Sequence, residues 1–340
     1  MSDRLSNSRF DQNRFMRRFG LTTPIALAPM AAASGGELAA ASAKAGALGL
    51  IGGGYGELDW TQEQHSIAAQ ALSTDPQASA RLGCGFITWK MAQDRSALDF
   101  VLERETPPTA LMLSFGDPTL FARDITARGI PLICQIQTMA QLPQAVDAGA
   151  SVIVAQGAEA GGHGMNAFDG RSTFTFVPEI ADWLAANAPH VDLLAAGGVA
   201  DGRGLAAALT LGAGGALIGT RLWATKESLA ADKAIAEAVQ ASGDDTVRSA
   251  VFDVLREKNW PEEYDFRALR NVIHRQWEDR MDELRADPTA AIADYKEGAA
   301  KQDYSRAHVT VGEGTGLVGN CLSAGDVIAQ ITAEARSLLG

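Results

Sequence analysis

The chain has 340 residues, of which 46% are hydrophobic and 21% charged, a composition typical of a globular protein with a substantial core. Its formal net charge is −12 and no run of basic residues offsets it, so we expect no nucleic-acid partner. No apolar run is long enough to cross a bilayer, and residues 1–20 have no apolar core of signal-peptide length, so we expect no membrane partner and a cytoplasmic location.

Eight short apolar runs alternate with amphipathic, alanine-rich segments in the first two thirds of the chain. The runs are residues 25–30, 47–52, 82–88, 110–115, 131–135, 151–155, 192–197 and 215–219. Most are apolar nearly throughout, as expected for parallel strands buried on both faces. The segments between them include expected helices at 37–45, 60–72, 118–128, 140–148, 178–188 and 202–211. This alternation predicts an α/β fold, a closed (β/α)8 TIM barrel. A doubly wound open sheet is the alternative, because periodicity alone does not show closure.

The alternation stops after residue 223. Residues 226–301 read as helices only, so we expect a helical appendage or lid at 226–305, inserted into a barrel domain formed by 1–225 and completed by 306–340. Apolar residues at roughly helical spacing are expected to pack this appendage against the barrel. They are Val272, Ile273, Trp277, Met281 and Leu284. A glycine-rich loop at 309–318, which we expect to return to the barrel mouth, precedes a closing helix at 324–339.

One histidine stands in a glycine-rich loop directly after the sixth apolar run. The sequence from Gln156 to Gly164 is QGAEAGGHG. Active sites of (β/α)8 barrels lie at the carboxyl ends of the strands, which is where this loop places His163. Glycines let the backbone approach a ligand, and an imidazole titrates near neutral pH. We therefore expect a flat cofactor beside a proton acceptor; the alternative is a surface loop with an incidental histidine. Glu159 lies near His163 in sequence, but its role stays unassigned.

Two more glycine-rich turns follow the seventh and eighth runs. Residues 195–204 read AAGGVADGRG, and residues 217–221 read LIGTR. In barrels these two loops form the usual phosphate site. Exposed N–H groups, a helix N-terminus and the Thr220 hydroxyl can all bind phosphate oxygens. Together with His163 they predict a phosphate-bearing cofactor across the barrel mouth, with Met30 at the end of the first run as a candidate edge for its ring.

Other catalytic motifs are absent from the sequence. The glycine-dense run at 51–56, IGGGYG, lacks the GxGxxG frame of a dinucleotide fold, and no P-loop occurs anywhere in the sequence, which disfavours classical Rossmann dehydrogenases and kinases. Without HExxH, CxxC or GxSxG frames, metal catalysis is not indicated and we expect no metal. The three cysteines, Cys84, Cys134 and Cys321, lie far apart in apolar stretches and are expected to be buried free thiols. No lysine stands at a strand end as a Schiff-base candidate, which disfavours an aldolase.

Five motifs resemble those of one family, the nitronate monooxygenases, formerly called 2-nitropropane dioxygenases. They are PIALAPM at 24–30, QGAEAGGHG at 156–164, AAGGVADGRG at 195–204, GTR at 219–221 and GEGTGLV at 312–318. The resemblance covers nearly the whole chain from Pro24 onward. It implies a barrel that binds FMN non-covalently, with His163 as the catalytic base. Many members carry an asparagine in the third-strand motif, where this chain has Gly83-Cys84-Gly85-Phe86.

The motifs and this resemblance together give a set of expected cofactor-binding residues around the flavin ring, its ribityl chain and its phosphate. They are Ala28, Pro29, Met30, Gly85, Gln156, Gly161, Gly162, Gly197, Gly198, Leu217, Ile218, Gly219 and Thr220.

The resemblance implies an activity, the FMN-dependent oxidation of alkyl nitronates or nitroalkanes by O2 to a carbonyl compound and nitrite. Related flavin enzymes share this barrel and part of the motifs, notably NADH:quinone reductases and flavin-dependent enoyl-acyl carrier protein reductases. The alternative function is therefore an NAD(P)H-dependent flavin reductase acting on a quinone or an enoyl thioester. A catalytically idle flavin-binding protein is a third hypothesis. The sequence leaves open the physiological substrate and assembly into a homo-oligomer.

Overall fold

The computed structural model describes residue 10 and residues 13–340. The expectation that residues 1–20 contain no signal peptide falls partly on residues 1–9, 11 and 12, which lie outside the described residues. No helix in the described part of the chain is both long and apolar enough to span a membrane.

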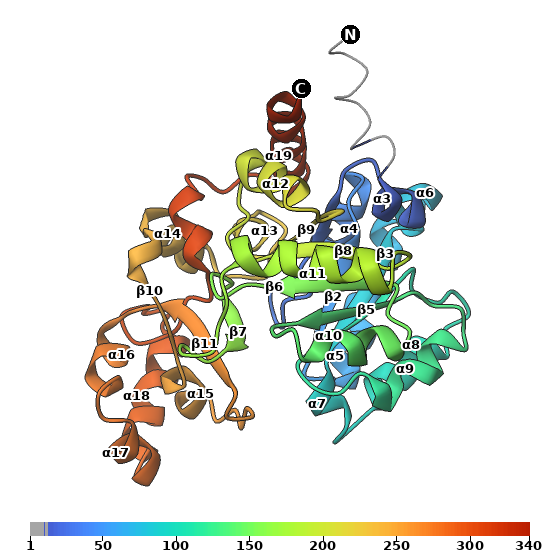
Figure 1. The fold of residues 1–340 in the computed structure, drawn as a ribbon. Coiled ribbons are helices and arrows are strands. Elements are labelled where there is room, and N and C mark those ends of the chain that lie inside the picture. Colours follow the sequence, from blue (N-terminus) through green and yellow to red (C-terminus); the bar gives the residue numbers. More distant parts are fainter. Residues whose placement is uncertain (1–9, 11–12) are drawn as a thin grey trace.

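Eight parallel strands form one sheet in the order β1-β9-β8-β6-β5-β4-β3-β2 (Figure 1). They are β1 (Ile25–Leu27), β2 (Gly49–Gly54), β3 (Leu82–Ile87), β4 (Leu111–Ser114), β5 (Leu132–Ile136), β6 (Val152–Gln156), β8 (Asp192–Ala196) and β9 (Gly215–Ile218). At the two edges, Leu27 N donates to Leu48 O and Leu48 N donates to Ile25 O, both at 2.9 Å. The edges therefore meet, which confirms the predicted (β/α)8 barrel; the open-sheet alternative is wrong.

Each predicted apolar run contains or overlaps one of these strands. The runs were recognisable because almost every residue in the barrel strands is buried on both faces, by the barrel interior and by the surrounding helices. The helices of the barrel part are α3 (Arg14–Phe19), α4 (Gly36–Lys44), α5 (Leu58–Ala71), α6 (Pro76–Ser79), α7 (Thr88–Met91), α8 (Ser96–Leu102), α9 (Thr119–Thr126), α10 (Gln141–Asp147), α11 (Thr173–Asn187), α12 (Gly202–Thr210), α13 (Thr220–Trp223) and α19 (Ala324–Leu339).

The segment that follows the barrel repeats is not made of helices only, so that prediction is wrong. Its helices are α14 (Asp232–Gln240), α15 (Val251–Leu255), α16 (Val272–Trp277), α17 (Met281–Ala286) and α18 (Thr289–Ala300), with a 3₁₀ turn, η1 (Gly243–Asp245). Two strands, β10 (Thr246–Ser249) and β11 (Tyr264–Leu269), join β7 (Gly162–Met165) in an antiparallel sheet of order β10-β11-β7. This sheet links the appendage to the sixth barrel unit, as Figure 1 shows.

The appendage has its own hydrophobic cluster, built on Phe252, Phe266 and Leu284. Of the apolar residues expected to face the barrel, Ile273 and Leu284 are buried in this cluster, Trp277 and Met281 pack against it, and Val272 is 65% exposed. Apart from Val272, these residues stabilise the appendage itself. The prediction that they pack the appendage against the barrel is therefore wrong. The domain boundaries remain a prediction.

The closing part of the chain returns to the barrel, as predicted. The 309–318 loop contains the 3₁₀ turn η2 (Glu313–Leu317), and Glu313 N donates to Glu159 O at 3.0 Å.

Two of the three cysteines are buried, as predicted. Cys84 and Cys134 are buried free thiols, but Cys321 is exposed. The prediction for Cys321 is wrong because it lies at the surface between the 309–318 loop and α19.

Candidate active site

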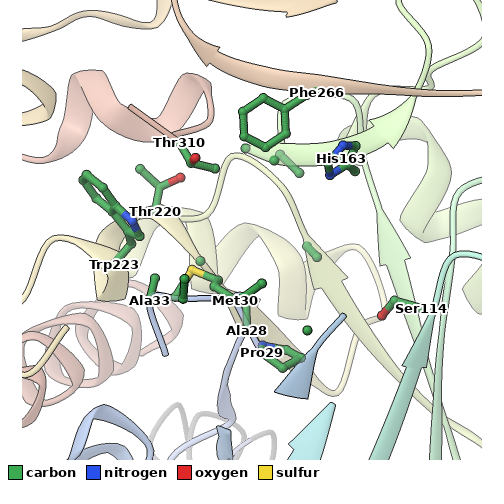
Figure 2. A pocket seen from close by; sticks show the side chains of 18 of the residues that line it. Ala28, Pro29, Met30, Ala33, Ser114, His163, Thr220, Trp223, Phe266 and Thr310 are labelled. Atoms are coloured by element: carbon green, nitrogen blue, oxygen red, sulfur yellow. The ribbon is translucent and has the colours of Figure 1, made fainter. Parts of the chain in front are cut away.

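A cavity of about 500 Å³ lies at the carboxyl ends of the barrel strands. Its volume is within the range usual for ligand pockets. It brings together all of the predicted site residues except Ile218, which is fully buried in β9. The lining set is Ala28, Pro29, Met30, Gly85, Gln156, Gly161, Gly162, His163, Gly197, Gly198, Leu217, Gly219 and Thr220. Figure 2 shows His163 and Phe266 on one side and Ala28, Pro29 and Met30 across from them.

The apolar wall is formed where the chain leaves β1. Met30 N donates to Ser34 Oγ at 2.6 Å, which fixes the turn that presents Ala28 to Met30. Gly85 on β3 packs directly beneath this wall, because a Cβ added there would lie 2.4 Å from Pro29 Cγ. Any larger residue at Gly85, including asparagine, would displace Pro29. Glycine at this position is thus required by the close approach of β3 to Pro29.

The opposite end of the cavity is glycine-rich. Gly197 and Gly198 both have positive φ, 100° and 76°, which favours glycine. Thr220 Oγ1 accepts a hydrogen bond from Gly312 N at 2.9 Å, so its own proton remains free to donate. Within the described residues, the backbone N–H of Gly198 has no hydrogen-bond partner. These donors fit a phosphate.

The sequence predicted that the N-terminus of α12 would help to bind a phosphate, but in the structure its N–H groups already have acceptors. Asp201 accepts from Gly204 N at 3.0 Å, and Glu334 of α19 accepts from Gly202 N at 2.7 Å. Two carboxylates therefore already occupy the positive end of the helix. A phosphate in this cavity would have to use the glycine turn and Thr220 instead.

His163 lies on a strand, not on the loop that its glycine neighbours predicted. It belongs to β7 and pairs with Phe266 of β11. Its Nε2 lies 2.9 Å and 3.1 Å from the two carboxylate oxygens of Asp253. Among the described residues, the hydrogen bonds of the ring all involve Nε2 and none involves Nδ1, and the residue lines the cavity. An ionised Asp253 accepts the Nε2 proton and leaves Nδ1 as the free proton acceptor.

Aromatic side chains enclose the imidazole. The Trp260 ring stacks on it with ring centroids 3.4 Å apart and an angle of 11° between the planes. The Phe266 ring approaches it at 4.8 Å. Trp260 is held in place by its own Nε1, which donates to Tyr55 Oη at 3.0 Å. These rings exclude water from most of the imidazole surface.

The surroundings disfavour charge on both members of the His163–Asp253 pair. Burial lowers the pKa of His163 well below its usual value, and the nearby Arg256 and Arg248 lower it further. Burial raises the pKa of Asp253 to about 7, against the opposing effect of Arg256. The imidazole is therefore neutral at neutral pH, as a general base must be.

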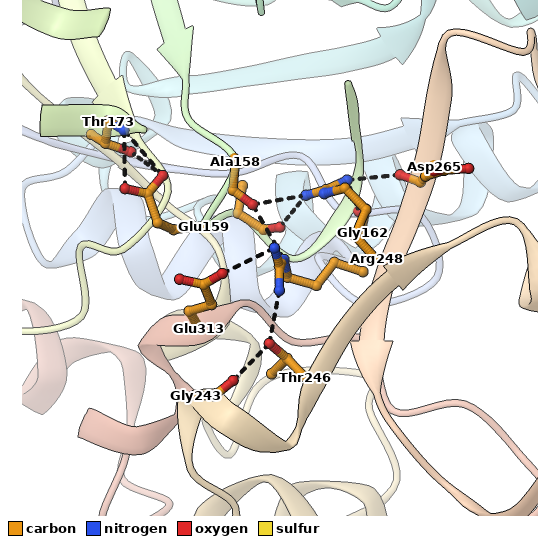
Figure 3. A network of polar contacts seen from close by, with 11 residues as sticks. Ala158, Glu159, Gly162, Thr173, Gly243, Thr246, Arg248, Asp265 and Glu313 are labelled. Atoms are coloured by element: carbon orange, nitrogen blue, oxygen red, sulfur yellow. Dashed lines mark hydrogen bonds and ion pairs between the residues drawn. The ribbon is translucent and has the colours of Figure 1, made fainter. Parts of the chain in front are cut away.

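The backbone around His163 is fixed by buried polar side chains (Figure 3). Arg248 of β10 donates to the carbonyl oxygens of residues 158, 160, 162 and 265. From the barrel side, Gln156 Nε2 donates to His163 O at 3.0 Å. Among the described residues, Glu159 makes no hydrogen bond to His163; its carboxylate accepts from Thr173 N and Thr173 Oγ1 at 3.0 Å, at the start of α11.

The model of one protein family, described as nitronate monooxygenase, matches residues 13–334. The chain belongs to the nitronate monooxygenase family. It is 31% identical to nitronate monooxygenase npaC of Metarhizium robertsii, with 92% of this chain and 90% of the relative covered. It is 32% identical to a nitronate monooxygenase of Neurospora crassa, with 91% and 88% covered. Among solved structures, FabK from Thermotoga maritima matches with a TM-score of 0.81 and 26% identity, covering 96% of this chain and 97% of that one.

This is a family of flavin-dependent oxidoreductases that act on small molecules, and the predicted family and enzyme class are confirmed.

Three residues beside the base were not predicted from the sequence, namely Asp253, Arg256 and Trp260. They reach His163 through the pairing of β11 with β7, which joins segments about a hundred residues apart. The one usable sequence signal was the alternation of aromatic and charged residues, Tyr-Asp-Phe-Arg, at the start of β11. Among the described residues, no group of three or more His, Cys, Asp or Glu side chains could hold a metal ion.

Replacing Arg248 by methionine should loosen the backbone that carries His163. Methionine fills the space but leaves four carbonyl oxygens without their donor, so we expect the free energy of unfolding to fall by roughly 2–4 kcal/mol. Urea denaturation would measure the change. The exposed Arg203, which bonds only to Asp201, provides a matched control: Arg203→Met should leave stability nearly unchanged. Equal stability of the Arg248 variant and wild type would contradict the anchoring role.

Proposed function

We propose that this chain oxidises alkyl nitronates, formed from nitroalkanes, to a carbonyl compound and nitrite, with FMN as cofactor and O2 as oxidant. The observation that carries this proposal is the neutral His163, held through Nε2 by Asp253 with Nδ1 free at the cavity. Family membership supports the same chemistry. The proposed partners are thus small molecules, a nitronate and O2, and the proposed location is the cytoplasm.

The cavity fits FMN in both shape and donor chemistry. The apolar turn at Ala28, Pro29 and Met30 offers a flat surface for a ring system, and the glycine turn with Thr220 offers donors to a phosphate. When bound there, FMN would supply the electron transfer between the nitronate and O2. The protein would contribute binding, orientation and proton transfer.

Proton removal is the step that this chain's own side chains perform. The carbon next to a nitro group is acidic enough for an imidazole to deprotonate, and the Nδ1 lone pair of His163 would take that proton. Asp253 would stabilise the imidazolium that forms, because its carboxylate already accepts from Nε2. Trp260 and Phe266 keep water away from the base, which preserves its neutral form before reaction.

The experiment that tests this function is an anaerobic stopped-flow comparison of flavin-loaded protein mixed with propyl-2-nitronate or with NADH or NADPH. We expect rapid loss of the oxidised flavin absorbance with the nitronate and none with the nicotinamides. The similarity to FabK, an enoyl reductase, makes the reductase the rival hypothesis. Rapid reduction by a nicotinamide alone would support that rival, and bound flavin that neither donor reduces would favour an idle binding protein.

A further inference from the structure

In the described chain, the side chain of Arg256 is largely buried and neighbours the Tyr55 hydroxyl and the Asp253 carboxylate. Its Nη1 is buried and has no partner there. The terminal nitrogens of other interior arginines are well bonded: both Nη atoms of Arg248 donate to carbonyl oxygens, although its Nε has no partner among the described residues, and Arg221 donates to the backbone and side chain of Asn320. A buried donor on a charged group is costly unless an acceptor meets it. The position therefore favours an anionic ligand.

The same arginine borders the cavity beside the base. Its Nη1 lies 3.8 Å from Asp253 Oδ1, too far for a hydrogen bond, and both oxygens of Asp253 are already within hydrogen-bond distance of His163. Its guanidinium lies 4.6 Å from the centre of the Phe266 ring, which also contacts His163. Arg256 is the only arginine or lysine among the described residues that line the cavity.

We propose that Arg256 binds the two oxygens of the substrate's nitro or nitronate group, an inference that rests on the proposed function. A guanidinium presents two parallel N–H donors, which match a planar group with two oxygens. When His163 removes the carbon proton, negative charge moves onto those oxygens, and the cation beside them stabilises it. Arg256 and His163 thus act on opposite ends of the same group of atoms, the oxygens and the adjacent carbon.

A carboxylate has the same planar pair of oxygens as a nitronate. Isobutyrate matches the shape of 2-nitropropane and the charge of propyl-2-nitronate but has no nitro group to oxidise. Isobutyramide has the same shape without the charge. This pair of ligands separates binding of an anion from binding of an apolar shape, and neither requires turnover.

The test is isothermal titration calorimetry of the flavin-loaded protein with both ligands. For Arg256→Met we expect the Kd of isobutyrate to rise about 10- to 100-fold, the loss of a charged hydrogen-bond pair. The Kd of isobutyramide should change by less than about threefold, because only the charge-dependent contact is lost. Arg256→Lys keeps the charge without the paired donors and should lie between wild type and Arg256→Met.

Arg280 provides the matched control. It lies over the Trp277 ring at 4.9 Å, as Arg256 lies over Phe266, but it is exposed and outside the cavity lining. Arg280→Met should therefore leave both dissociation constants unchanged. Flavin content and melting temperature of each variant show whether it has folded, and the lysine variant keeps the test valid if the methionine variant does not fold.

Two results would overturn the proposal. If Arg256→Met weakens isobutyrate and isobutyramide equally, Arg256 only shapes the cavity through its contact with Phe266. If neither constant changes, the anion binds elsewhere. The proposed function is tested separately. If wild-type protein binds isobutyrate through Arg256 but propyl-2-nitronate does not reduce its flavin, the anion site is supported and the nitronate reaction is ruled out.

Discussion

His163→Asn should nearly abolish activity on neutral nitroalkanes and largely spare activity on preformed nitronates. Only the nitroalkane needs its carbon proton removed, and a positioned base accelerates such a transfer by about 10²–10⁴-fold. We expect kcat/KM to fall by about that factor for 2-nitropropane and by less than about tenfold for propyl-2-nitronate. Steady-state oxygen consumption with each substrate measures both losses.

The asparagine variant keeps the local backbone contacts, because Gln156 bonds the carbonyl oxygen of residue 163 and not its side chain. His190→Asn is the control, since His190 is exposed and outside the cavity lining. Equal losses on the nitroalkane and the nitronate would argue against a base and for a role of His163 in binding both substrates.

The barrel could be predicted from sequence because each strand carries its own signal. A run such as 151–155 is apolar on both faces and lies between helical segments, so it can be recognised without knowing its partners. The strands of the second sheet carry weaker signals. β10 has four residues, and β7 contains two glycines that look like a loop. β11 alternates with period two, but only over six residues.

The candidate site likewise has one part that could be predicted from the sequence and one part that could not. Its glycine turns and His163 lie at strand ends, which the barrel architecture assigns to one rim. Asp253 and Trp260 lie near the appendage strands, and no local pattern relates a carboxylate at 253 to a histidine at 163. The antiparallel pairing of Phe266 with His163 sets that distance. Predicting it would have required the register of two short strands, which tertiary packing determines.

Asp253 is the positioning residue that holds the base. Asp253→Asn should lower kcat/KM for nitroalkanes by about 10²–10⁴-fold, because an amide can turn its NH2 toward Nε2 and place the imidazole proton on Nδ1. Asparagine has nearly the volume of aspartate, so the fold should persist. Preformed nitronates, which need no base, should lose much less activity.

The pH profile distinguishes this role from a merely structural one. The pKa of Asp253 is raised by burial to about 7, so the His163–Asp253 pair takes up a proton as the pH falls through that value. That proton blocks Nδ1 in either location: on the carboxylate it donates to Nε2 and moves the imidazole proton to Nδ1, and on the imidazole it occupies Nδ1 directly. Wild-type activity on nitroalkanes should therefore rise as the pH increases through about 7, and Asp253→Asn should lose this rise.

Asp265→Asn is the control and should keep the rise. It changes another carboxyl group whose pKa is raised by burial, but this group has no hydrogen bond to His163. An unchanged rise near pH 7 in the Asp253 variant would assign that proton to another group and leave the orientation of His163 without its proposed cause.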